Sequence, residues 1–299
     1  MHNHQNSIAM PLQITEFKNL HRQFKTAGLC KLLLYRIIND WYIWQEFKLL
    51  TKFFSGKRGL EVGGPSSIFS GSLFPIYSLA GEMDNCNFST NTVWEGKLKE
   101  GYTFNYHKNK YGFQFINEAI ALQAESNHYD FLISSNMLEH VANPIKALNE
   151  FKRVVKPNSY LLLIVPHGQG TPDYRRPITK LNHILQDYRN DVDEHDLTHM
   201  PEIVTCRDYS TINLSREQYL ERSRNNYVNR CLHHHVFNTD LLLTLVDYVG
   251  LQTCFVGFHP PGDIVLLCKK TKNKNNSAFF DKDASWRKLS PFSFDHRLY

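Results

Sequence analysis

Histidine, aspartate and arginine side chains are concentrated in one polar stretch of the 299-residue chain, residues 167–235. Seven of the fifteen histidines fall within it. These residue types titrate near neutral pH, coordinate metals or bind anions with a forked geometry. A stretch of this length without a clear secondary-structure pattern is unusual unless it folds over a functional site. We therefore expect residues 167–235 to form a substrate site.

Three interpretations of this stretch remain open. In the first, a histidine removes a proton from a hydroxyl or amine while arginines hold an anionic substrate. The candidates for these roles are His167, His234, His235, Arg175 and Arg176. In the second, a divalent metal is bound, but no HExxH motif is present and no metal is assigned. Its candidate ligands are His195, His199, His234 or His235, and Asp196. In the third, the polar residues have a structural role and satisfy one another's hydrogen-bonding groups.

A second group of residues with chemical potential follows apolar segments earlier in the chain. Gly63 and Gly64 come directly after the expected strand 58–62, where they allow a tight turn and the close approach of a ligand. Asp84 follows twenty residues after Gly64, at a spacing suited to accepting ribose hydroxyl protons. Glu118 follows a later strand and could meet an adenine edge. These residues predict a nucleoside-type ligand at the carboxyl edge of a parallel sheet.

The elements that must position these residues are buried strands alternating with helices. Strands are expected at 58–62, 76–80, 113–117, 129–134 and 159–165. The segment 143–156 has helical periodicity, and such an alternation is typical of a parallel sheet with right-handed crossovers. After the polar stretch, a helix at 238–249 precedes strands at 251–258 and 263–268. The His-Pro-Pro-Gly link between these strands predicts an antiparallel hairpin.

The flanking segments predict smaller additions to this core. Residues 1–55 carry aromatic and apolar positions at helical spacing, which indicates a helical cap with breaks at Gly28 and at Asn39-Asp40. The main domain is expected at 56–270, with 167–235 as an insertion. The tail, 271–299, begins polar, and its aromatic end is expected to dock on the body.

Composition excludes several classes of protein. Hydrophobic residues make up 42% and charged residues 21%, which is typical of a globular protein and argues against disorder. A net charge of +5 is too small to indicate a nucleic-acid partner. No apolar run is long enough for a membrane span and no signal-peptide pattern opens the chain, so a cytoplasmic location is expected. The six dispersed cysteines exclude a zinc knuckle, and the oligomeric state is left open.

The block YDFLISSNMLEHVANPIKALNEFKRVVKPNSYLLLIVPH at residues 129–167 resembles the strand-four to strand-five block of class I S-adenosylmethionine-dependent methyltransferases. The shared features are the aspartate leading the strand, Asp130, the triplet Leu138-Glu139-His140, and the run from Arg153 to Ser159. With Glu61-Val62-Gly63-Gly64, the resemblance covers 56–167 and 236–268. It implies an α/β, Rossmann-like, seven-stranded, mostly parallel sheet with an antiparallel last strand, an N-terminal helical cap and a long insertion after strand five.

The resemblance also implies the cofactor S-adenosyl-L-methionine and the residues that bind it. Glycines would line its methionine part, Asp84 its ribose, Glu118 its adenine and Ser135 its sulfonium. The full set is Glu61, Gly63, Gly64, Asp84, Glu118, Ala119, Ser135 and Asn136. His140 is interpreted as structural at that helix start. Pro65 and Ser67 stand where the family has further glycines, which puts the shape of this loop in doubt.

The expected function is methyl transfer to the oxygen or nitrogen of a small-molecule or carbohydrate-linked acceptor. One alternative keeps the cofactor but performs cyclisation or aminocarboxypropyl transfer. Another is a non-catalytic, methyltransferase-like binding module. A nicotinamide-binding protein is disfavoured because the G-x-G-x-x-G motif is absent.

Overall fold

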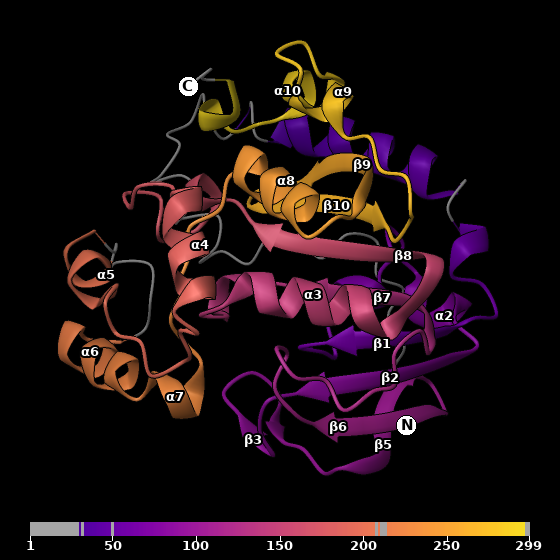
Figure 1. The fold of residues 1–299 in the computed structure, drawn as a ribbon, viewed down its shortest axis with the longest axis horizontal. Helices are drawn as coiled ribbons and strands as arrows, with labels where there is room; N and C mark the ends of the chain where they lie inside the picture. Colours follow the sequence, from indigo (N-terminus) through magenta and orange to yellow (C-terminus); the bar gives the residue numbers. More distant parts are fainter. Residues whose placement is uncertain (1–29, 31–32, 49–50, 207–208, 210–213, 297–299) are drawn as a thin grey trace.

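The computed structural model describes residues 30, 33–48, 51–206, 209 and 214–296. Its centre is an eight-stranded sheet with the order β5-β6-β2-β1-β7-β8-β10-β9 (Figure 1). These strands are β1 (Arg58–Val62), β2 (Glu82–Asn87), β5 (Gly101–His107), β6 (Lys110–Ile116), β7 (Tyr129–Ser135), β8 (Val155–Pro166), β9 (Gln252–His259) and β10 (Asp263–Lys269). A separate small ribbon pairs β3 (Asn91–Thr92) with β4 (Gly96–Lys97).

The expected fold class is confirmed, with one added strand. Strands β6, β2, β1, β7 and β8 run parallel to one another, and β10 lies antiparallel between β8 and β9. The sheet has eight strands instead of seven because β5 folds back antiparallel on β6 at the sheet edge. The predicted hairpin at the other edge is present. The parallel strands therefore share one carboxyl edge, where a ligand site is expected.

The second predicted strand is wrong. Residues 76–80 contain the helical turn α2 (Ile76–Leu79), whose Ile76 and Tyr77 are buried, and the strand is β2. β2 was missed because it is polar, yet it is buried along nearly its whole length. Its Asn85 side chain bonds the Gly64 backbone at 3.1 and 2.8 Å and Gln114 at 2.9 Å. Satisfied hydrogen bonds make this polar burial tolerable.

Helices cover both faces of the sheet. Helix α3 (Pro144–Val154) begins as predicted, with Asn143 accepting a hydrogen bond from Lys146 N at 3.2 Å and proline at the first turn. Its Ile145, Leu148 and Phe151 join a large apolar cluster that also contains residues of α8 (Thr239–Tyr248). The opposite face is covered by a second cluster, which includes residues of α2 and Ile43 of the N-terminal helix.

The N-terminal helix runs without interruption over residues 33–48, so the predicted break at Asn39-Asp40 is wrong. Asn39 is tolerated in mid-helix because its buried side chain donates to Tyr35 O at 2.9 Å and to Leu289 O at 3.1 Å. The predicted break at Gly28 lies outside the described residues, as does most of the predicted cap before residue 30.

The insertion is more ordered than the sequence suggested. It contains α4 (Leu181–Arg189), α5 (Met200–Cys206), α6 (Arg216–Arg224) and α7 (Asn226–Asn229), at the left of Figure 1. The tail carries α9 (Ser277–Phe280) and α10 (Ser285–Leu289), and its Trp286 and Phe292 are buried in the large cluster. Within the described ranges, none of the helices is long and apolar enough to cross a membrane.

Candidate functional site

A cavity of about 1130 Å³ opens at the carboxyl edge of the parallel strands. One part of its wall comes from the loops that follow β1, β2, β6 and β7. The other part comes from the insertion, the β9–β10 link and the N-terminal helix. The wall residues used below are Arg36, Asp40, Gly63, Asn87, Glu95, Glu118, Ala119, Ser135, Asn136, Glu139, His140, Glu194, Arg230, His233 and Asp263. This is the edge where open α/β sheets place their ligands.

The two glycines after β1 have different roles. Gly63 lies in the cavity wall with φ +91°, a backbone conformation that side chains disfavour. A Cβ there would lie 2.8 Å from Met137 Cγ. A Cβ on Gly64 would instead overlap the Glu61 carboxylate, 2.0 Å from its Cδ. Gly63 thus keeps the cavity open, while Gly64 lets the loop close over Glu61.

Gly63→Ala should weaken S-adenosylmethionine affinity by about tenfold, because a left-handed conformation costs a side chain about 1–2 kcal/mol and Met137 would be pushed into the cavity. Calorimetric titration with the cofactor measures this. Gly71→Ala is the matched control, because Gly71 lies in the same wall with an ordinary φ of −75°. Equal affinity in both variants would contradict the role given to Gly63.

Glu61 supports the loop that follows β1. It is fully buried, and its carboxylate accepts hydrogen bonds from Ser66 N at 3.0 Å and Tyr77 Oη at 2.5 Å. Burial raises its pKa to about 7, and these two hydrogen bonds oppose the shift. Glu61 does not line the cavity, so the structure gives it a supporting role instead of the predicted contact with the cofactor. It anchors the loop that carries Pro65 and Ser67 in place of further glycines.

The Glu61→Gln variant should gain stability relative to the wild type as the pH rises. A folded pKa of about 7 against 4.5 unfolded means that the folded state holds the proton between these values. The contribution of Glu61 is therefore largest below pH 4.5 and is lost as pH rises to about 7. The stability difference between variant and wild type should grow by roughly 3 kcal/mol across this window. Urea unfolding at a series of pH values measures it, and a pH-independent difference would contradict the assignment.

Asp84 does not occupy the predicted ribose position. It lies inside β2, opposite Leu60 of β1, because the strand begins later than predicted. Its buried carboxylate accepts hydrogen bonds from Arg58 Nη2 at 2.8 Å, Phe113 N at 2.9 Å and Tyr129 Oη at 3.0 Å. It is absent from the cavity wall. We therefore correct its role from cofactor binding to tying β2 to three other strands, β1, β6 and β7.

Asn87 ends β2 and lines the cavity where an acid was expected. Its Oδ1 accepts hydrogen bonds from Asn85 Nδ2 at 2.7 Å and Gln114 Nε2 at 2.9 Å. Its Nδ2 is the amide atom left to meet a ligand. The sequence could indicate this residue only through its position at the end of a strand. That end was predicted at the wrong position because β2 itself was.

Four other predicted cofactor residues lie in the wall: Glu118, Ala119, Ser135 and Asn136. Glu118 is held by Arg230, whose Nη2 donates to Oε1 at 2.6 Å. Asn136 has φ +49°, which turns the chain sharply after β7. The structure brings these residues together at one cavity, and their contacts with the cofactor remain predictions.

Where the insertion meets the loop after β7, the cavity wall contains an acid–histidine group that was not predicted as catalytic. Ligand atoms of Glu139, His140 and His233 lie within 4.8 Å of one another. His233 Nδ1 lies 2.6 Å from Oδ2 of the buried Asp173. Burial raises the pKa of Glu139 to about 7 and lowers that of His140, whose Nδ1 lies 3.0 Å from Leu232 O. The Leu-Glu-His triplet and the histidine run were the signals available in the sequence.

The predicted base His167 and the predicted substrate clamp Arg176 are both buried away from this cavity. His167 Nε2 lies 3.3 Å from Asp295 Oδ1, and its ring stacks on Phe292. Arg176 Nε donates to Glu202 at 2.6 Å, and its Nη1 donates to His233 O at 2.9 Å. Full burial and these partners leave neither side chain accessible to a substrate, so we correct both roles to structural ones.

The other three predicted catalytic residues also lie outside the cavity wall. Arg175 is exposed and its guanidinium lies over the Tyr174 ring. His234 is buried, with Nε2 3.2 Å from Glu194 Oε2. His235 Nε2 lies 3.1 Å from Ala142 O. The three consecutive histidines thus point to three different environments, and only His233 lines the cavity.

The cavity wall carries more negative than positive side chains. Six carboxylates line it, against two guanidinium groups: Asp40, Glu95, Glu118, Glu139, Glu194, Asp263, Arg36 and Arg230. Both arginines are already paired, Arg36 with Asp40 at 3.6 Å and Arg230 with Glu118 at 2.6 Å. Burial raises the pKa of Glu139 to about 7 and that of Asp263 to about 6, so the negative excess is smaller than the number of acids near neutral pH. With both arginines paired, the wall still favours neutral or cationic ligands over anionic ones.

A family model for a methyltransferase domain matches residues 43–212. A putative methyltransferase from Haloferax volcanii, solved with the Trm112 methyltransferase activator, has 8% identity and a TM-score of 0.46, covering 86% of this chain and 99% of that one. An S-adenosylmethionine-dependent methyltransferase from Mesorhizobium loti has 13% identity and a TM-score of 0.45, covering 76% and 96%. No curated protein matches the sequence. Because the family model spans more than half of the chain, the protein belongs to the methyltransferase domain family and is an S-adenosylmethionine-dependent enzyme.

Proposed function

We propose that this enzyme methylates a hydroxyl oxygen or an amine nitrogen of a small-molecule or carbohydrate-linked acceptor, with His233 as the general base. The observation that carries the proposal is the 2.6 Å contact between His233 Nδ1 and Asp173 Oδ2 at the cavity wall. A hydroxyl or ammonium group must lose a proton when it is methylated. A positioned histidine removes such a proton in many enzymes.

The cavity fits S-adenosylmethionine. The space beside Gly63, which a Cβ would narrow against Met137, suits an extended ligand that passes close to the backbone. Residues that would hold the cofactor are Gly63, Asn87, Glu118, Ala119, Ser135 and Asn136. The excess of carboxylates suits its positive sulfonium. When bound, the cofactor supplies an activated methyl group, so the protein mainly has to align an acceptor and handle its proton.

The His233–Asp173 pair is suited to proton removal. The Asp173 carboxylate, whose Oδ2 lies 2.6 Å from His233 Nδ1, favours the tautomer that carries the ring proton on Nδ1 and the lone pair on Nε2. Nε2 takes the acceptor proton, and the buried carboxylate of Asp173 then stabilises the imidazolium. Arg176 lies 3.6 Å from Asp173 Oδ1 and donates to His233 O, so it holds both members of the pair.

The charge of the wall restricts the acceptor. The predicted anionic substrate required arginines that face the cavity. The structure places Arg175 at the surface and buries Arg176 beside Asp173 and the half-exposed Glu202. A carboxylate or phosphate on the acceptor would face the acids of the wall instead. Glu139, whose pKa burial raises to about 7, and Asp263, whose pKa it raises to about 6, are positioned to bond hydroxyl or amine groups.

The test is incubation of the full chain with methyl-labelled S-adenosylmethionine and fractions of a polar-metabolite and glycan extract. We expect label in a neutral or basic acceptor, together with S-adenosylhomocysteine. Methylthioadenosine as the sulfur product would support the aminocarboxypropyl or cyclisation alternative. Cofactor binding without turnover in any fraction would support the binding-module alternative.

A further inference from the structure

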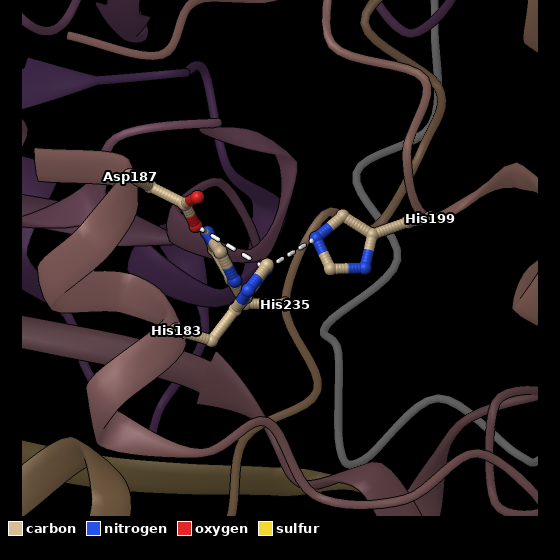
Figure 2. A group of neighbouring side chains, drawn as sticks. All are labelled: His183, Asp187, His199 and His235. Atoms are coloured by element: carbon tan, nitrogen blue, oxygen red, sulfur yellow. Dashed lines mark hydrogen bonds and ion pairs between the residues drawn. The ribbon is translucent and has the colours of Figure 1, made fainter. Parts of the chain in front are cut away.

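A second cluster of histidines and an aspartate lies in the insertion, outside the cavity wall. His183 and Asp187 stand four residues apart on one face of α4, His199 lies just before α5, and His235 comes from the segment that leads to α8. Figure 2 shows the four side chains converging from these three segments. One potential ligand atom from each lies within 4.8 Å of all the others.

The spacing of these atoms matches a small tetrahedral ion. Bonds of about 2.0–2.1 Å to nitrogen and oxygen place neighbouring ligand atoms roughly 3.3 Å apart. Here His183 Nε2 lies 3.0 Å from His199 Nε2 and 3.4 Å from Asp187 Oδ2. One ring nitrogen of His235 lies within 4.8 Å of these three atoms. Three imidazoles and one carboxylate are a ligand set that Zn²⁺ accepts.

Hydrogen bonding around His235 also fits metal ligation. Its Nε2 lies 3.1 Å from the carbonyl oxygen of Ala142, and its buried Nδ1 has no hydrogen-bond partner among the described residues. Buried polar atoms without partners are rare. Histidine ligands usually donate one ring N–H to a carbonyl or carboxylate and offer the other nitrogen to the metal. A metal would thus satisfy a group that the protein leaves unpaired.

Helix α4 packs on the large apolar cluster through Ile184, but the part of the insertion that follows α4 has little apolar packing of its own. Its own buried cluster contains only Ile203, Tyr219 and Leu232 in the described part of the chain, with a few partly buried neighbours. A structural metal commonly replaces an apolar core in such a small unit. We propose that His183, Asp187, His199 and His235 bind one divalent transition-metal ion of the Zn²⁺ type, which fixes the outer part of the insertion to α4 and to the segment that leads to α8. With four protein ligands the site is closed, as structural zinc sites are.

The site has a consequence for the cavity, and this part rests on the proposed function. His235 is separated from His233 by one residue, in a segment without regular secondary structure. Fixing His235 to α4 therefore fixes the backbone that presents His233 to the acceptor. The ion acts as a positioning element, because none of its ligands lines the cavity.

The test measures metal in the full-length protein. Protein produced with added ZnCl₂ and exchanged into metal-free buffer should carry about one zinc per chain by mass spectrometry of the elements, as expected for a closed site. Asp187→Asn and His199→Ala should each lower zinc affinity by more than about 100-fold, beyond the usual effect of outer-shell changes. His195→Ala is the matched control, because His195 is exposed beside Asp193 and should keep full zinc content.

Two further measurements keep the inference falsifiable if a variant fails to fold. Cobalt titration into chelator-treated wild type should give the visible bands of a tetrahedral site, and zinc should raise its melting temperature. Wild type that binds no zinc, cobalt, nickel, iron or manganese in stoichiometric amount would overturn the metal site. Zinc loss from His195→Ala equal to that of His199→Ala would do the same. Full metal content without methyl transfer would instead count against the proposed function and leave the metal site standing.

Discussion

His233→Ala should lower the turnover number by about 10²–10⁴-fold, the usual contribution of a positioned general base, while cofactor affinity changes by less than about twofold. The reason is geometric. His233 comes from the insertion and is not among the residues predicted to bind the cofactor, which come from the loops after β1, β6 and β7. Initial rates with labelled cofactor and the identified acceptor, beside calorimetric titration with the cofactor, separate the two quantities.

Two further variants distinguish a base from a residue that only supports the fold. Asp173→Asn keeps the shape of the pair but favours the wrong tautomer of His233, so it should lower turnover strongly without weakening cofactor binding. His195→Ala changes an exposed histidine of the same insertion and should behave as wild type. Turnover within tenfold of wild type in His233→Ala would show that another group, such as Glu139, takes the proton.

Elements with a strong apolar pattern could be predicted from the sequence. The strand at 129–134, the helix at 143–156 and the terminal hairpin were confirmed, because their buried faces are made of apolar side chains. β2 could not be found in this way. Its buried residues include Asp84, Asn85 and Asn87, whose partners come from strands that lie far away in the sequence. Hydrophobic periodicity carries no information about such a polar network.

The sequence predicted which region of the chain forms the candidate site, but not which residues line it. The carboxyl edge of the sheet and the insertion do form the cavity. Which of three consecutive histidines faces it depends on backbone direction, and that is set by Asp173, Glu194 and Ala142 as partners. Residue type alone also could not distinguish Arg175 from Arg176. Tertiary packing decides which of the two charged side chains is buried, and the buried one should contribute measurably to the free energy of unfolding.

Arg176→Ala should lower the free energy of unfolding by about 3–5 kcal/mol, the usual effect of removing one partner from a buried ion pair. The Arg176 side chain is fully buried, and its loss would leave Asp173 without a nearby guanidinium and Glu202 without its 2.6 Å partner. It would also remove the donor to His233 O. Urea unfolding followed by circular dichroism measures the loss.

The neighbouring arginine supplies the control for this prediction. Arg175 is exposed, and a surface substitution there should change stability by less than about 0.5 kcal/mol. Arg176→Lys should fall between the two, because an ammonium keeps the charge but cannot reproduce the forked contacts with Glu202 and the backbone. If Arg175→Ala impaired acceptor binding while Arg176→Ala left stability unchanged, Arg175 would be a substrate clamp after all. The structural role assigned to Arg176 would then be wrong, because its ion pairs would contribute nothing to the free energy of unfolding.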